Sequence, residues 1–111
     1  MVNKDWLGEF EQIVLLAVLR LGANAYGFSV QQEIQERTGR TCSLGAIYTT
    51  LDRMEQKGFV SSSKGESTPE RGGRAKKYFK VEGAGETALR HSYAAATAMS
   101  AGLEPVLGGA Q

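Results

Sequence analysis

The apolar residues of this chain change their spacing at Gly58. Before that position they recur every three or four residues, which predicts amphipathic helices. The expected helices cover 7–21, 27–38 and 44–57. After it, two short alternating segments at 59–63 and 75–81 predict strands on either side of a glycine-rich loop at 64–74. A last, alanine-rich helix is expected at 86–101, and the chain is therefore expected to be mainly α with a small β-hairpin.

The connection between the second and third expected helices is short. Gly39 suits a helix C-terminus, where a left-handed residue is needed, and Ser43 suits the N-cap of the next helix. Two helices joined by a short turn match a helix-turn-helix, and a basic hairpin directly after them matches the wing of a winged helix. We expect a winged helix-turn-helix domain at 1–82, a C-terminal dimerisation helix at 83–103 after a break at Gly83 and Gly85, and a flexible tail at 104–111.

The formal net charge of +1 hides an uneven distribution of charge along the chain. Residues 37–81 contain ten lysines and arginines against four acidic residues, a net charge of +6, and the remainder carries −5. A basic segment in an otherwise acidic chain favours a local surface for a polyanion such as nucleic acid. The alternative is a solvated basic loop without a partner.

The third expected helix and the hairpin carry the candidate DNA-binding residues. Small and hydrogen-bonding side chains on the outward face of such a helix can approach base edges, and cations of a wing can bind phosphates or enter the minor groove. The candidates are Ser43, Gly45, Tyr48, Thr49, Thr50 and Arg53 on the helix, and Arg71, Arg74, Lys76 and Lys77 on the wing. The alternatives are an ordinary solvated helix face and a charged edge strand that prevents aggregation.

Apolar residues beyond the needs of one small core indicate a dimer. The first expected helix has apolar residues outside its main stripe, and the last has an apolar seam at alternating steps of four and three residues. The candidate dimerisation residues are Leu15, Leu16, Leu19, Leu89, Tyr93, Ala96 and Leu103. The alternative is that both helices pack only within their own domain.

Residues for catalysis or for metal and cofactor binding are scarce. His91 is the only histidine, Cys42 is the only cysteine, and no phosphate-binding glycine motif is present. We therefore expect no enzyme activity, no metal and no cofactor. The longest apolar run has seven residues, far below the ~20 of a membrane span, and the first residues do not resemble a secretory signal. A single cysteine favours a reducing, cytoplasmic location.

Four segments of the sequence closely resemble the PadR-like family of bacterial transcriptional regulators. They are residues 8–22, 25–27, 43–58 and 68–79, and the likeness extends from residue 7 to about residue 90. The resemblance implies a winged-helix domain, a C-terminal dimerisation helix and operator binding, usually as a repressor. It implies DNA contacts for Tyr48, Thr49, Arg53, Arg74 and Lys76. Some relatives release DNA when small aromatic or lipophilic compounds bind near the dimer interface.

Other functions remain open on the residues alone. A winged helix can serve as a protein-interaction module, with its basic wing against an acidic partner. Binding of single strands or RNA would favour more exposed aromatic residues than Tyr78 alone. We expect a dimeric regulator that binds double-stranded DNA at a near-palindromic operator.

Overall fold

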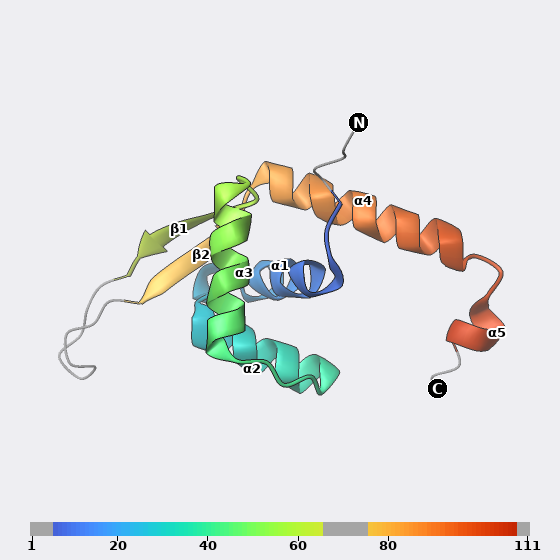
Figure 1. Ribbon diagram of the computed structural model, residues 1–111, viewed down its shortest axis with the longest axis horizontal. Coiled ribbons are helices and arrows are strands. Elements are labelled where there is room, and N and C mark those ends of the chain that lie inside the picture. Colours follow the sequence, from blue (N-terminus) through green and yellow to red (C-terminus); the bar gives the residue numbers. More distant parts are fainter. Residues whose placement is uncertain (1–5, 66–75, 109–111) are drawn as a thin grey trace.

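The computed structural model of the chain describes residues 6–65 and 76–108. These residues form a mainly helical fold with one two-stranded antiparallel hairpin, as predicted (Figure 1). The elements are α1 (Glu9–Leu21), the 3-10 helix η1 (Gly22–Asn24), α2 (Gly27–Thr38), α3 (Leu44–Gln56), β1 (Val60–Lys64), β2 (Lys77–Val81), α4 (Gly83–Ser100) and α5 (Glu104–Leu107). Of these, η1 and α5 were not predicted.

The helix α1 lies at the centre of the core. It packs against α2, α3, β2 and α4, so its middle turns are covered on several sides. The largest fully buried side chains come from three helices and are Val14, Leu15, Val18, Val30, Ile47, Leu51 and Met54. Leu15 was predicted to be spare apolar surface for a second copy, and that is wrong, because the chain's own elements surround it.

The turn between α2 and α3 has the predicted geometry. Gly39 adopts a left-handed conformation with φ 75°, and its amide donates to the Gln35 carbonyl at 2.8 Å. The hydroxyl of Ser43 accepts from the Ala46 amide at 3.0 Å and so caps α3. The Gln31 amide group donates to the Cys42 carbonyl at 2.7 Å, which ties the turn to α2. Hydrogen bonds within α2, the turn and the start of α3 therefore stabilise the helix-turn-helix.

The hairpin is joined to the helical body by its second strand. Val60 pairs with Val81 and Lys64 with Lys77, which leaves Phe79 and Val81 on one buried face. The Phe79 amide donates to the Ala25 carbonyl at 2.8 Å, and Tyr26 forms a bridge with Tyr78. The base of the wing is thus fixed to the segment that precedes α2.

The helix α4 begins earlier than predicted. Gly83 and Gly85 were expected to interrupt the chain, but both belong to the first turn of α4. A Cβ atom at Gly85 would overlap the Phe59 carbonyl oxygen, so glycine lets the helix approach the hairpin closely. From there α4 extends away from the helical body (Figure 1). No helix among the described residues is long and apolar enough to cross a membrane.

Candidate nucleic-acid interface

The outward face of α3 carries most of the predicted helix residues. Gly45, Tyr48, Thr49 and Arg53 are exposed, and Ser43 is exposed at the N-terminal end of the helix. Thr50 is different, because its side chain is 3% exposed and lies among the core residues of α3. The prediction that Thr50 faces a ligand is therefore wrong. The helical rotation puts residue 50 on the same side as residues 47, 51 and 54.

Tyr48 is held against the beginning of α2. A Cβ atom at Gly27 would overlap both the ring and the hydroxyl oxygen of Tyr48, so the aromatic ring rests directly on the glycine backbone. The side chain is nevertheless 40% exposed. The Tyr48 ring is therefore held by its contact with Gly27 but remains partly exposed, and it lies next to Thr49 in the chain.

Arg53 is engaged in an ion pair with α1. Its Nε atom donates to the Glu11 carboxylate at 3.2 Å, and the Lys57 ammonium lies 3.8 Å from the same carboxylate oxygen. Burial by itself raises the pKa of Glu11. The hydrogen bond from the Gly8 amide and the two cations outweigh burial, so this pKa lies below its usual value. Glu11 was not among the predicted site residues, because its partner Arg53 is 42 residues away in the chain.

Two cations of the wing, Lys76 and Lys77, contact aromatic and acidic side chains. The Lys76 ammonium lies 4.3 Å from the centre of the Tyr26 ring, and this ring meets Tyr78 edge-on at 5.5 Å. Lys77 lies 3.8 Å from the Glu55 carboxylate, which also accepts from the Ser62 hydroxyl at 2.7 Å. Glu55 therefore holds the hairpin beside α3. The predicted contacts Arg71 and Arg74 lie outside the described residues.

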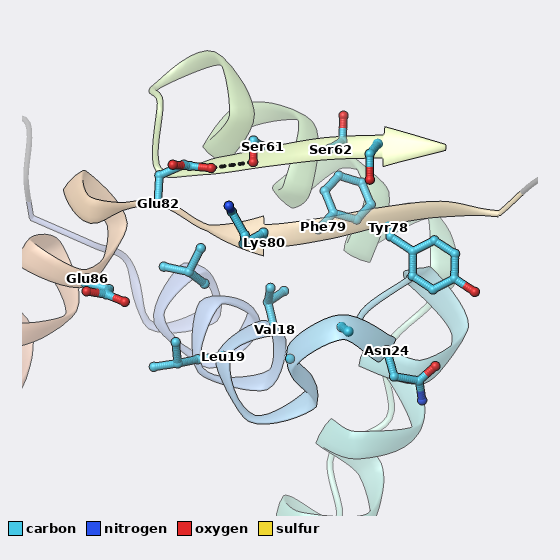
Figure 2. A pocket seen from close by; sticks show the side chains of 14 residues that line it. Val18, Leu19, Asn24, Ser61, Ser62, Tyr78, Phe79, Lys80, Glu82 and Glu86 are labelled. Atoms are coloured by element: carbon cyan, nitrogen blue, oxygen red, sulfur yellow. Dashed lines mark hydrogen bonds between the residues drawn. The ribbon is translucent and has the colours of Figure 1, made fainter. Parts of the chain in front are cut away.

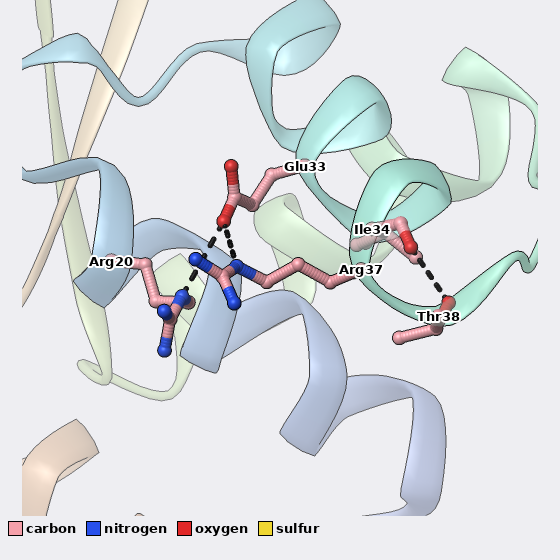
Figure 3. A network of polar contacts seen from close by, with 5 residues as sticks. All are labelled: Arg20, Glu33, Ile34, Arg37 and Thr38. Atoms are coloured by element: carbon pink, nitrogen blue, oxygen red, sulfur yellow. Dashed lines mark hydrogen bonds and ion pairs between the residues drawn. The ribbon is translucent and has the colours of Figure 1, made fainter.

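A second group of charges connects α1 and α2 (Figure 3). The Glu33 carboxylate accepts from Arg37 at 2.6 Å and pairs with Arg20 at 3.4 Å. Thr38 donates to the Ile34 carbonyl at 2.6 Å. The four-residue spacing of Glu33 and Arg37 could have signalled this pair from the sequence. Arg20 and Arg37 thus have acidic partners within the chain.

The apolar surface that remains is concentrated on α1, α4 and α5. Of the predicted dimerisation residues, Leu16, Leu19, Tyr93, Ala96 and Leu103 are not part of the buried core. Leu89 is 7% exposed and belongs to the core, so its assignment to an intersubunit seam is wrong. The start of α4 packs against α1 and β2, which bury it. Exposed apolar residues that the prediction omitted are Trp6, Phe28, Leu44, Met99, Val106 and Leu107.

A cleft of about 950 Å³ lies between the end of α1, the hairpin and the start of α4 (Figure 2). Val18, Leu19 and Val81 provide apolar walls, and Lys80 and Glu86 provide charged ones. The Ser61 hydroxyl donates to the Glu82 carboxylate at 2.5 Å along one side.

Within the described parts of the chain, no cluster of three metal-ligating side chains is present.

Comparison with known proteins matches the chain to a family of regulators. Residues 15–91 match the sequence profile of the transcriptional regulator PadR-like family. No curated protein sequence matches the chain.

Solved structures share the fold over almost the whole length. A putative transcriptional regulator from Thermoplasma acidophilum is 25% identical, with a TM-score of 0.66, and the match covers 89% of this chain and 93% of that one. A PadR-like transcriptional regulator from Bacillus cereus is 20% identical, with a TM-score of 0.70, covering 91% and 93%. A PadR family transcriptional regulator from Eggerthella lenta is 20% identical, with a TM-score of 0.69, covering 92% and 88%. The predicted winged-helix fold is confirmed.

Proposed function

The chain belongs to the PadR-like family of transcriptional regulators, and we propose that it recognises a specific duplex operator with α3 and the hairpin. In this proposal residues 1–82 bind DNA, and α4 with the residues up to 103 joins two copies. Residues 104–111, which begin with the short helix α5, form a tail. The place of action is the cytoplasm, where a bacterial regulator meets the chromosome.

One observation carries the proposal, namely that Glu55 holds the basic hairpin next to the exposed face of α3. Its carboxylate binds Ser62 and Lys77 of the two strands at 2.7 and 3.8 Å. Figure 1 shows α3 and the hairpin as neighbours. A recognition helix in the major groove with a cationic hairpin beside it places side chains at base edges and at phosphates together.

The two elements have different roles in this proposal. Thr49 and Arg53 read bases, since both lie on the exposed face of α3. Lys76 and Lys77, together with Arg71 and Arg74, bind the phosphate backbone. The backbone amide groups that follow Ser43 at the N-terminus of α3 can bind a further phosphate.

The assembly that we propose is a two-fold dimer. Tyr93 is 72% exposed and Met99 79% on the outer part of α4, and Leu16 and Leu19 add apolar surface on α1. So many exposed apolar side chains are unusual on a monomer, and a two-fold dimer is the simplest assembly that would cover part of them. Two recognition helices would then lie about 34 Å apart, which calls for a near-palindromic operator.

The proposal also covers whether the protein represses or activates transcription and what releases it from DNA. We assign the role of a repressor that a small aromatic or lipophilic effector releases from DNA. The cleft of about 950 Å³ supports an effector, because Leu19 contributes to its apolar walls and also lies in the proposed dimer surface. Occupation of such a cleft would alter the spacing of the two recognition helices.

The competing function is a protein-interaction module whose basic wing meets an acidic partner. The two functions differ in their response to duplex DNA. Selection of bound duplexes from a random-sequence pool, followed by a salt titration, tests them directly. We expect one near-palindromic sequence to be enriched. We also expect the affinity to fall strongly with salt, with a slope of the logarithm of the binding constant against the logarithm of the salt concentration of about −0.9 for each phosphate bound. A slope near zero with no enriched sequence would overturn the proposal.

A further inference from the structure

The Glu11 carboxylate lies beneath the exposed face of α3 and belongs to a different part of the chain. Its side chain is 15% exposed, and it comes from the first turns of α1. One of its oxygens accepts from the Gly8 amide at 2.9 Å, and the other faces Arg53 at 3.2 Å and Lys57 at 3.8 Å. A single, largely buried carboxylate thus holds two cations of the recognition helix.

The atoms used in this contact matter for recognition. Arg53 meets Glu11 through Nε, whereas a bidentate contact to guanine uses a pair of guanidinium N–H donors in one plane. An arginine anchored at one edge keeps its other donors in a defined plane and loses less conformational freedom on binding. The same carboxylate also compensates the charges of Arg53 and Lys57, which weakens their attraction to phosphates of any sequence.

We propose that Glu11 is a positioning residue for sequence discrimination, which aims Arg53 at a base edge and restrains Arg53 and Lys57 from binding the backbone indiscriminately. This inference rests on the proposed function. Its effect is on the ratio of operator to random-duplex affinity more than on affinity itself. Without the carboxylate, both cations of α3 become available to any duplex.

The variant Glu11→Gln tests this inference in the full-length protein. Glutamine keeps the size of the side chain and an oxygen for the Gly8 amide, but it removes the charge that holds Arg53. We expect the ratio of operator to random-duplex affinity to fall about tenfold, the lower end of what one base contact contributes. We also expect tighter random-duplex binding with a salt slope steeper by roughly one unit, as for one additional phosphate contact.

The matched control is Glu9→Gln. Glu9 is two residues away on the same helix, and its removal changes the net charge equally, but its partner is Arg40 at 2.8 Å and not a residue of α3. We expect Glu9→Gln to leave the operator-to-random ratio as in the wild type. Equal falls in the ratio for both variants would overturn the inference, because they would show an effect of overall charge.

A second arm asks whether Glu11 acts through Arg53. In an Arg53→Ala background, Glu11→Gln should produce no further fall in the ratio. A further fall of similar size would overturn the inference, and thermal unfolding of each variant verifies that it is folded. A wild type that prefers no sequence would overturn the proposed function itself, whereas a discriminating wild type with an unchanged Glu11→Gln ratio overturns only the role of Glu11.

Discussion

Arg53 and Lys76 are both cations of the candidate interface, but their surroundings differ. Arg53 is bound by a carboxylate from another helix, and Lys76 lies over the face of Tyr26. A carboxylate directs the donors of the guanidinium, whereas a ring face attracts an ammonium without orienting its protons. This difference agrees with the proposed roles, in which Arg53 reads bases and Lys76 binds the phosphate backbone.

Loss of a base contact and loss of a phosphate contact should have different effects on DNA affinity. We expect Thr49→Ala on α3 to reduce the discrimination between operator and random duplex by about 1–3 kcal/mol, because a base contact is lost. We expect Lys76→Ala to weaken all duplexes by a similar factor, since phosphate contacts carry little sequence information. Titrations with both duplexes measure this. A uniform loss in both variants would contradict a reading role for α3.

The pKa of Glu11 predicts how stability depends on pH. A carboxyl whose folded-state pKa is lowered stabilises the fold above its unfolded pKa, about 4.3, and this contribution is lost as the pH falls through the folded pKa. We expect Glu11→Gln to lower the free energy of unfolding at neutral pH, with the difference from wild type shrinking below about pH 4. Urea unfolding at several pH values measures it, and a constant difference would contradict the prediction.

Among the elements, the junction between the hairpin and α4 depends on one glycine. The backbone of Phe59 occupies the space that a side chain at Gly85 would need. The Glu82 amide also donates to the Phe59 carbonyl at 2.8 Å, so this oxygen is held in place. The hairpin and α4 are thus coupled by close backbone contact.

Substitution of this glycine should loosen the junction. We expect Gly85→Ala to destabilise the protein by about 1–3 kcal/mol, since the backbone must shift to admit a methyl group. Gly83→Ala is the control, because nothing lies within 4 Å of the place its Cβ atom would take and alanine favours a helix. Thermal or urea unfolding compares the two. An unchanged free energy of unfolding for Gly85→Ala would contradict the claim that close backbone contact at this junction requires glycine.

For the whole molecule, the exposed apolar face of α4 and the end of α1 determine the assembly that we propose. Leu103 is 49% exposed and Tyr93 72%, whereas Leu89 of α4 is buried within its own subunit. In the proposed dimer, α4 therefore contributes its outer half and the residues that follow it. The inner half fixes the helix to the winged-helix domain.

A charge on this outer part should separate the subunits without unfolding them. We expect Tyr93→Asp or Leu103→Asp to give a folded monomer with a large loss of operator affinity, since only one half-site is then held. Weak binding to random duplex should survive, because α3 and the wing are unchanged. Leu89→Asp should instead unfold the domain. Sedimentation at micromolar concentration decides this, and a monomeric wild type that binds one half-site tightly would exclude the dimer.

The local features of the fold could be predicted from the sequence. Apolar spacing located α1, α2, α3 and both strands to within about two residues, and Gly39 and Ser43 marked the turn correctly. The exposed face of α3 with Tyr48, Thr49 and Arg53 followed from the same helical period. These properties depend on neighbouring residues, so periodicity and capping suffice to predict them.

The features that depend on distant residues were decided only by the tertiary structure. Helical period alone could not reveal that the packing of α1 against several elements buries Leu15. Nor could it reveal that Gly85 lies inside a helix, where the nearby Phe59 carbonyl leaves no room for a side chain. It also could not pair Glu11 with Arg53 across 42 residues. Burial and ion pairing are set by which surfaces meet in space. A sequence specifies those surfaces, but their contacts exist only once the helices have packed.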